Sequence, residues 1–599
     1  MPLFSFRFRA ARTLVAVAAS IMVAQGVVAQ GTGSAPLALA KVDNSNIDAP
    51  LFYQLLIGEM QLREGEAGAA FQVILDAARR TKDEQLFRRA TDIALQARAA
   101  DQALVSAKAW RQTLPESLDA LRYQVQLLVA VNRPQETLEP LQALLKQTPA
   151  AERPSLITAL PRFFTRSTDK AQIATLIEQV LRPYIDVPDT RVASLVTSGR
   201  SWLAAQDSAK ALEFAQRAHL LDPAAEGPAG LALEMPPGDA AAAVIVQGHL
   251  AAKPDSHGVR LLYVRALLAV PRYADAAAQL ETLTRTAPQL AQAWLTLGAL
   301  HLQLREPAPA IEALQKYVQL VQAGGAVPKP ETDAADDDAP ASTEDALTRA
   351  WLLLAQAADL QGDFRASEAW LAKIEDPQRA LEVQTRRASL LARQGKLAQA
   401  RELIRRVPEK TPADARAKLL AEAQVLRDAK QWAEANTLLA KANLQFTDDV
   451  DLIYEQSMML EKLNKLDDME RLLRRVIALK PDHQHAYNAL GYSLAERNVR
   501  LPEARTLIKK ALDLSPGEPS ITDSLGWVEY RLGNRDEAVR LLRDAYRGQP
   551  DAEIAAHLGE VLWVNGQKDE ARAVWREGRG KDAGNEVLRE TLARLRVDL

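Results

Sequence analysis

A spacing of thirty-four residues recurs along this chain and limits the folds that are open to it. Pro516 and Pro550 lie thirty-four residues apart, and the segment before each is rich in Leu and Ala. Within such segments a Gly is followed twelve residues later by an Ala, as in Gly526 and Ala538. Two helices can cross closely only where both side chains are small. The pattern therefore predicts helical hairpins, each with a face that only the next hairpin can cover.

The period and the residue types are typical of the tetratricopeptide repeat (TPR), a helical hairpin that stacks into solenoids. Gly559 with Ala571 repeats the spacing near the C-terminal end, and Gly298 with Ala310 carries it in the first half of the chain. Ala, Leu, Arg, Gln and Glu are abundant, and these residues favour helix. We therefore predict an all-α superhelical solenoid of about thirteen to fifteen hairpins.

The composition excludes several kinds of site. The 599 residues include no cysteine, which removes thiol catalysis and thiolate metal sites. For the same reason we expect no lipid anchor on an N-terminal cysteine. The net charge is −3, with Arg and Glu interspersed, so the sequence does not indicate a nucleic-acid surface.

The N-terminal segment has the pattern of a secretory signal peptide. Three arginines precede an apolar run over residues 14–28, and small residues then predict cleavage after Ala29. The alternative is an uncleaved membrane anchor, for which this run is short. We expect residues 1–29 to be removed and a soluble periplasmic protein to begin at Gln30. Residues 30–50 contain Gly, Pro and polar residues, which predict a flexible leader.

The remaining chain divides at a change in composition. Hairpin patterns run over residues 51–322, with a degenerate unit at 228–238, where Pro-Pro-Gly interrupts the pattern. Residues 323–345 contain Gly, Pro and an Asp run without apolar periodicity, which predicts a disordered acidic loop. A second array follows over residues 346–586. Residues 587–599 are predicted to form a capping helix with a charged outer side.

No catalytic motif stands out in the sequence. It contains no G-x-S-x-G, no H-E-x-x-H and no phosphate-binding glycine loop. His483 and His485 lie beside Asp482, but two histidines at a repeat turn are more often surface residues than metal ligands. We therefore predict a protein that is not an enzyme, with no cofactor and no metal site.

The inner face of the last three hairpins carries the candidate binding residues. In TPR hairpins, positions on either side of the small residue of the first helix face the concave groove. Aromatic side chains at such positions can anchor a peptide, because they bury a large area at a low entropic cost. The alternative, packing between helices, is equally open. The candidate groove residues are Asn488, Tyr492, Asp523, Trp527, Tyr530 and Trp563.

Four runs of sequence resemble large exported TPR proteins of Gram-negative bacteria, in particular adaptors of the LbcA type. These proteins partner a carboxy-terminal processing protease. The runs are Asn488-Ala-Leu-Gly-Tyr492, Asp523-Ser-Leu-Gly-Trp-Val-Glu-Tyr-Arg-Leu-Gly533, Leu51-Phe-Tyr-Gln-Leu-Leu and Ala90-Thr-Asp-Ile-Ala-Leu.

The resemblance implies a periplasmic adaptor that brings peptidoglycan hydrolases to the protease for degradation. The chain departs from this type because it lacks the lipidation cysteine. An alternative function is a TPR scaffold in exopolysaccharide export or in another envelope assembly system.

Overall fold

A computed structural model describes residues 48–236, 238–324, 342–376 and 379–599. The predicted signal peptide, most of the predicted leader and most of the predicted acidic loop lie outside these residues. The described residues form thirty-one α-helices and three short 3-10 helices, with no strand among them. No helix in this part of the chain is both long and apolar enough to cross a bilayer.

The helices of the first half are α1 (Ala49–Arg63), α2 (Ala67–Thr81), α3 (Glu84–Gln96), α4 (Ala100–Thr113), α5 (Leu118–Ala130), α6 (Leu138–Gln147), α7 (Arg153–Ala159), α8 (Lys170–Leu181), α9 (Arg191–Ala204), α10 (Ser208–Leu221), α11 (Glu226–Leu233), α12 (Ala240–Ala252), α13 (His257–Ala269), α14 (Tyr273–Thr286), α15 (Ala291–Gln303) and α16 (Pro307–Gln322). The 3-10 helices are η1 (Pro134–Thr137), η2 (Leu160–Phe164) and η3 (Arg182–Tyr184).

The helices of the second half are α17 (Thr343–Leu360), α18 (Phe364–Leu371), α19 (Ala380–Arg393), α20 (Leu397–Arg406), α21 (Pro412–Asp428), α22 (Trp432–Gln445), α23 (Val450–Lys462), α24 (Leu466–Leu479), α25 (Gln484–Glu496), α26 (Leu501–Leu514), α27 (Pro519–Arg531), α28 (Arg535–Gly548), α29 (Ala552–Val564), α30 (Lys568–Lys581) and α31 (Glu586–Leu595). Successive helices pair into antiparallel hairpins, and α31 follows the last pair.

Small residues allow the two helices of a hairpin to cross closely, as the spacing predicts. A Cβ atom added at Gly526 would lie 2.7 Å from Leu542 Cγ of the partner helix. One added at Gly491 would lie 2.9 Å from the carbonyl oxygen of Ala504. Real Cβ atoms do not approach other atoms so closely, so only glycine fits without a shift. The prediction of an all-α solenoid of stacked hairpins is confirmed.

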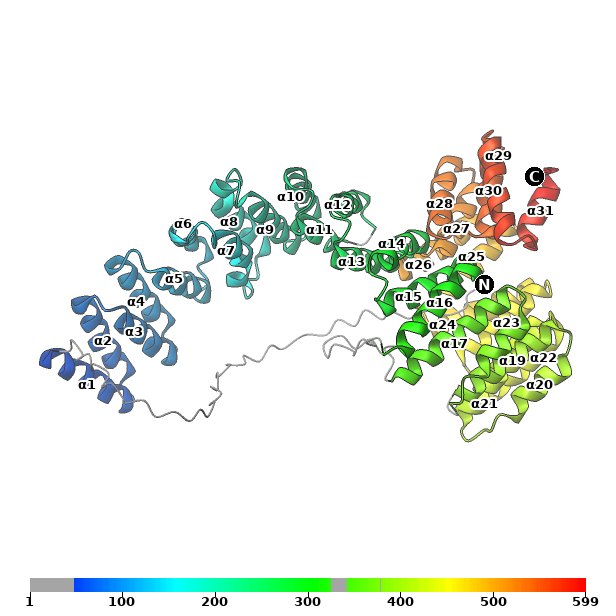
Figure 1. Cartoon of the computed structure of the whole chain (residues 1–599), viewed down its shortest axis with the longest axis horizontal. Helices are drawn as coiled ribbons and strands as arrows, with labels where there is room; N and C mark the ends of the chain where they lie inside the picture. The colour runs from blue at the N-terminus through cyan, green and yellow to red at the C-terminus, as the bar shows by residue number, and fades with distance from the viewer. Residues whose placement is uncertain (1–47, 237, 325–341, 377–378) are drawn as a thin grey trace.

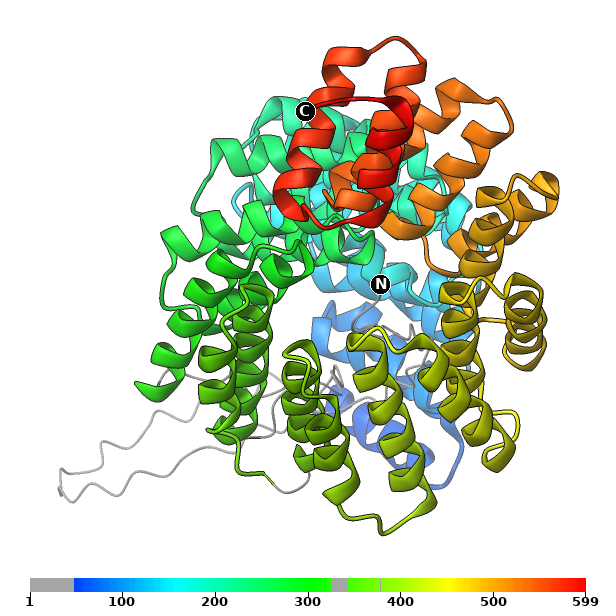
Figure 2. The same cartoon turned by 90° about the vertical axis from the view of Figure 1, so that its right-hand side faces the viewer.

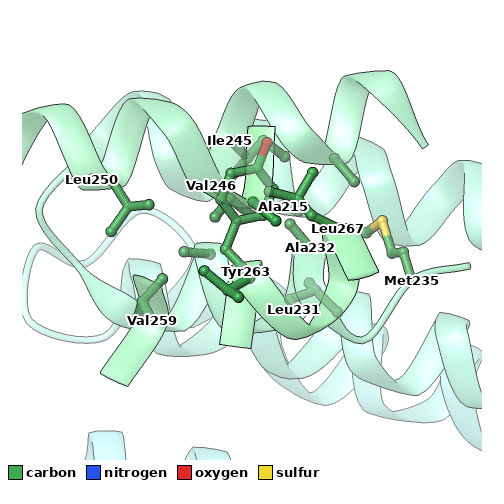
Figure 3. Packing of buried hydrophobic residues seen from close by; sticks show 14 of the residues in the cluster. Ala215, Leu231, Ala232, Met235, Ile245, Val246, Leu250, Val259, Tyr263 and Leu267 are labelled. Atoms are coloured by element: carbon green, nitrogen blue, oxygen red, sulfur yellow. The ribbon is translucent and has the colours of Figure 1, made fainter. Parts of the chain in front are cut away.

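The core is a row of hydrophobic clusters rather than one central core. The largest cluster extends from α8 to α16, and Figure 3 shows its side chains meeting between α10 and α13. The degenerate unit predicted at 228–238 lies here, and its helix α11 has only eight residues. Leu231 of α11 and Met235 beyond its end are still buried, so the short unit keeps the stack continuous.

Two helix starts differ from the predicted limits. Helix α17 begins at Thr343 rather than at 346, because the Ser342 side chain caps it by accepting a hydrogen bond from Asp345 N at 3.1 Å. Helix α31 begins at Glu586, one residue before the predicted cap, and Asn585 accepts a hydrogen bond from Leu588 N at 2.9 Å. Both caps were present in the sequence as signals of a helix start.

The solenoid has two parts of different shape. Helices α1–α13 form an extended arm, which Figure 1 shows on the left, in blue to green. Helices α14–α31 follow one another round a ring, which Figure 2 shows face on with the arm behind it, and we call this part the closed turn. In it, α14 contacts α28. The array therefore returns to itself in this second part.

Ion pairs join the two ends of the closed turn, at a contact that we call the seam. Arg305, between α15 and α16, donates from Nη1 to Asp582 Oδ2 at 3.3 Å. Lys581 Nζ donates to Glu306 Oε1, a pair of residues 275 apart in the chain. Glu306 also accepts from His301 Nδ1 at 2.9 Å. Lys581 and His301 lower the pKa of the Glu306 carboxyl, although burial opposes this shift, so Glu306 is charged at neutral pH.

Candidate functional site

The first helices of the last hairpins contact one another directly. Helix α25 contacts α27, α27 contacts α29, and α29 contacts α31. The side chains that face across these contacts therefore lie in register at intervals of one repeat. The predicted groove residues belong to this row of helices.

A polar cluster joins three of these helices, and we call it the His557 cluster: Tyr492, Glu496, Asp523, Trp527 and His557. His557 Nδ1 lies 2.8 Å from Asp523 Oδ2, and its Nε2 lies 3.3 Å from the Tyr492 hydroxyl oxygen. The Trp527 indole stacks on the imidazole, with ring centroids 4.4 Å apart. Trp527 Nε1 donates to Glu496 Oε2 at 2.8 Å. Helices α25, α27 and α29 are thereby held together through one histidine.

The His557–Asp523 pair is charged despite its burial. Burial alone lowers the pKa of His557, but the charge and hydrogen bond of Asp523 outweigh it and raise the pKa to about 9. The imidazole therefore carries both protons at neutral pH and donates to Asp523 and to the Tyr492 oxygen. Burial also raises the pKa of the neighbouring Glu553 carboxyl. Removing either partner would leave a buried group without its counter-charge.

Two of the six predicted groove residues are buried. Asp523 is 5% exposed and Trp527 is 3% exposed, and both are occupied within the His557 cluster. A partner could not reach them without displacing these contacts. For Asp523 and Trp527 the structure favours the alternative of packing between helices.

The other four candidates keep part of their surface. Tyr492, Tyr530, Trp563 and Asn488 are all partly exposed. Trp563 lies against Trp575, with ring centroids 5.6 Å apart, while Lys568 Nζ lies 5.1 Å from its ring centroid. The Asn488 Oδ1 atom is buried and has no hydrogen-bond partner among the described residues. That these residues bind a protein remains a prediction.

Sequence reasoning missed the histidine at the centre of the cluster. His557 lies thirty-four residues after Asp523 and therefore takes the same place in the next hairpin. Other pairs follow the same rule, since Arg393 contacts Asp359 at 2.6 Å and Arg594 contacts Glu560 at 2.8 Å. A search for opposite charges one period apart would have found all three.

Among the described residues there is no group of three or more His, Cys, Asp or Glu side chains placed to hold a metal ion. His483, which the sequence analysis took as a surface residue, accepts a hydrogen bond from Ala486 N at 3.1 Å and caps α25. The row of first helices α25, α27 and α29 carries a mixture of aromatic, amide and carboxylate groups.

The comparison with family models supports a TPR protein. A tetratricopeptide repeat family model matches residues 262–326, 454–519 and 524–586. These stretches lie in helices α13–α16, α23–α26 and α27–α31, so they include most of the His557 cluster and the predicted groove residues. TPR arrays are scaffolds for protein–protein interaction.

Two curated relatives are similar to parts of the chain. The TPR repeat-containing protein PA4667 of Pseudomonas aeruginosa is 38% identical over 215 residues, which are 36% of this chain and 36% of that protein. Tetratricopeptide repeat protein 7A of Homo sapiens is 42% identical over 79 residues, which are 13% of this chain and 9% of that protein. The chain thus matches about a third of the bacterial relative's length and less of the human one.

Solved structures of MamA are also similar to part of the chain. MamA 41-end from Desulfovibrio magneticus RS-1 is 14% identical, with a TM-score of 0.25, and the match covers 29% of this chain and 98% of MamA. A second structure, MamA AMB-1, is 22% identical with a TM-score of 0.24 and covers 28% of this chain.

Proposed function

We propose that the protein is a non-enzymatic periplasmic scaffold that binds other proteins along its TPR array. The observation that carries this proposal is the array itself, a continuous stack of hairpins with matches to the TPR family model in both halves. Such a stack offers a long surface whose side chains are fixed by neighbouring repeats. The export pattern at the N-terminus supports a periplasmic location.

The finer proposal is an adaptor that delivers peptidoglycan hydrolases to a carboxy-terminal processing protease. It is supported by the sequence runs that resemble LbcA-type adaptors and by the similarity to a bacterial TPR protein over about a third of its length. In this function the scaffold binds two kinds of protein, and increases their effective concentration for each other. The protease would then cut hydrolases that it seldom meets in free solution.

Partly exposed groove residues are the first choice for contact with a client. Asn488 is the residue whose replacement tests client binding most directly, because its unpaired oxygen makes no hydrogen bond that the fold would lose. Because Oδ1 is buried, a client would hydrogen-bond to the amide Nδ2 of this partly exposed side chain, which would donate to a client backbone carbonyl, and such a bond is worth about 1 kcal/mol. Replacing Asn488 should therefore affect binding more than folding.

The test is affinity purification from a periplasmic extract with the protein as bait, followed by identification of the bound proteins by mass spectrometry. We expect a carboxy-terminal processing protease and at least one peptidoglycan hydrolase. For Asn488→Ala we expect hydrolase capture to fall about fivefold at unchanged Tm, consistent with the loss of about 1 kcal/mol. The matched control is Gln445→Ala, an exposed amide on α22.

One result would contradict the proposal, and another would exclude only Asn488 from the client site. Capture of polysaccharide-export components in place of the protease and hydrolase would favour the alternative scaffold function. Equal capture by wild type and Asn488→Ala would remove Asn488 from the client site and leave the adaptor function to be mapped elsewhere on the array.

A further inference from the structure

The first helix of the array is apolar on two sides. One side packs on the hairpin, where Leu55 and Leu62 lie against the first hydrophobic cluster and Gly58 meets Ile74. The other side faces solvent, and we call it the α1 patch. A helix that is apolar all round is normally buried all round. The α1 patch consists of Phe52 (55% exposed), Tyr53 (62%), Leu56 (44%), Ile57 (49%) and Met60 (51%).

The polar side chains of α1 turn away from this patch. Glu59 pairs with Arg89 of α3, with Arg89 Nη2 2.7 Å from Glu59 Oε2. Gln54 Nε2 donates to the carbonyl oxygen of Val73 at 3.0 Å. The middle of the patch therefore carries no charge, and two such patches could meet without bringing like charges together.

The opposite end of the array has a different surface. The outer side of α31 exposes Arg589, Glu590, Arg594 and Arg596. An apolar patch placed on this side would bury charged groups, which is costly unless they are paired. Stacking of the α1 patch of one copy on α31 of the next is therefore disfavoured. The arrangement that is left is contact between the α1 patches of two copies.

The α1 patch has the geometry for pairing of two identical helices. Phe52, Leu56 and Met60 form one ridge at intervals of four residues, and Tyr53 and Ile57 form the next. Ridges of this kind interdigitate when two helices pack at their most common crossing angle. Five half-exposed large side chains would bury roughly 400 Å² per copy, or about 800 Å² in total, which is less than the roughly 1,000 Å² of a stable interface and indicates a weak and reversible pair.

We propose that the α1 patch is a dimerisation surface, on which a second copy of this chain packs its own α1 about a two-fold axis. Leu56 stands at the middle of α1 and therefore lies next to the axis, close to Leu56 of the other copy. Each protomer projects its array away from the shared helices. The dimer presents two arrays, and this inference does not depend on the proposed function.

Sedimentation velocity on the purified protein over roughly 1–100 μM tests the proposal, because a weak and reversible pair should dissociate within this range. We expect wild type to change from monomer to dimer over this range and Leu56→Glu to remain monomeric, with at least a tenfold weaker Kd. Leu56→Lys should behave likewise, and a mixture of the two variants should recover the dimer. Leu444→Glu, at a position 84% exposed on α22, is the control and should dimerise like wild type.

The sedimentation of wild type and of Leu56→Glu separates the proposal from other occupants of the patch. If the first forty-seven residues of the chain or another protein cover α1, wild type remains monomeric throughout the range, and the proposal is wrong. If wild type dimerises and Leu56→Glu dimerises equally well, the contact lies elsewhere and the proposal is also wrong. An unchanged Tm of Leu56→Glu shows that loss of the dimer does not arise from unfolding.

Discussion

The arm and the closed turn are built from the same hairpin but are held together differently. Among the described residues of the arm, each ion pair between side chains joins residues of the same hairpin or of neighbouring hairpins, as between Arg200 and Glu234. The closed turn adds the seam, where Lys581 meets Glu306 across 275 residues. Stability of the arm should therefore be a sum over neighbouring repeats, whereas the closed turn also depends on its closure. One repeat pattern can thus give a part that is held only by contacts between neighbouring repeats and a part that is also held by closure.

The largest effect is expected from breaking the His557 cluster in the closed turn. Asp523→Asn leaves a buried imidazolium without its counter-charge, and we expect a loss of about 3–5 kcal/mol in the free energy of unfolding. Chemical denaturation followed by circular dichroism measures this loss. Asp569→Asn, at a fully exposed position on α30, should change stability by less than about 0.5 kcal/mol. A loss of this small size in Asp523→Asn would show that the buried pair is not a support of the closed turn.

The same pair predicts that the stability of the protein falls as the pH rises above neutral. The pKa of His557 is raised from 6.5 to about 9 in the folded protein, so the folded state binds the proton more tightly than the unfolded state. The stabilisation is complete below about pH 6.5 and disappears as the pH rises through about 9. The Tm of wild type should fall over this interval, and the Tm of His557→Gln should fall less. Parallel profiles would remove His557 as the cause.

A smaller effect is expected from overpacking one hairpin crossing. Gly526→Leu forces side-chain atoms into space that Leu542 occupies, at a cost of roughly 1–3 kcal/mol or more. Hydrogen exchange should lose protection over residues 519–552 first, because contacts are local. Gly58→Leu is the counterpart in the arm, where a Cβ would lie 2.8 Å from the flexible end of Ile74. Unchanged protection in Gly526→Leu would contradict the assigned register of the hairpin.

The smallest effect on stability, but the largest on shape, is expected at the seam. Arg305→Gln with Lys581→Gln removes both cations, and partly exposed ion pairs are each worth about 1 kcal/mol or less. We expect little change in Tm but a larger radius of gyration in small-angle X-ray scattering, as the closed turn opens. Raising the salt concentration should open wild type in the same direction. Arg543→Gln, which removes a pair between neighbouring hairpins, is the control.

The sequence predicted what is local in this fold. Gly526 and Ala538 predicted a crossing because both helices belong to one hairpin and the steric rule acts over a few residues. The seam could not be predicted in this way, since the positions of Arg305 and Asp582 depend on small rotations accumulated over many hairpins. For the candidate site, the positions in the row of first helices could be predicted. The burial of Trp527 could not, because it depends on a histidine of the next repeat.

Arg305 of the seam also lies in the turn inside a hairpin. In most hairpins the second residue after the first helix adopts a left-handed backbone, and it is glycine in some of them, such as Gly533 and Gly566. Arg305 takes this position with φ 55°, a conformation that costs a non-glycine residue roughly 1–2 kcal/mol. A mutation to glycine would relax the turn and remove one of the seam's two cations in one step. An unstrained turn and a closed seam therefore favour different residues at position 305.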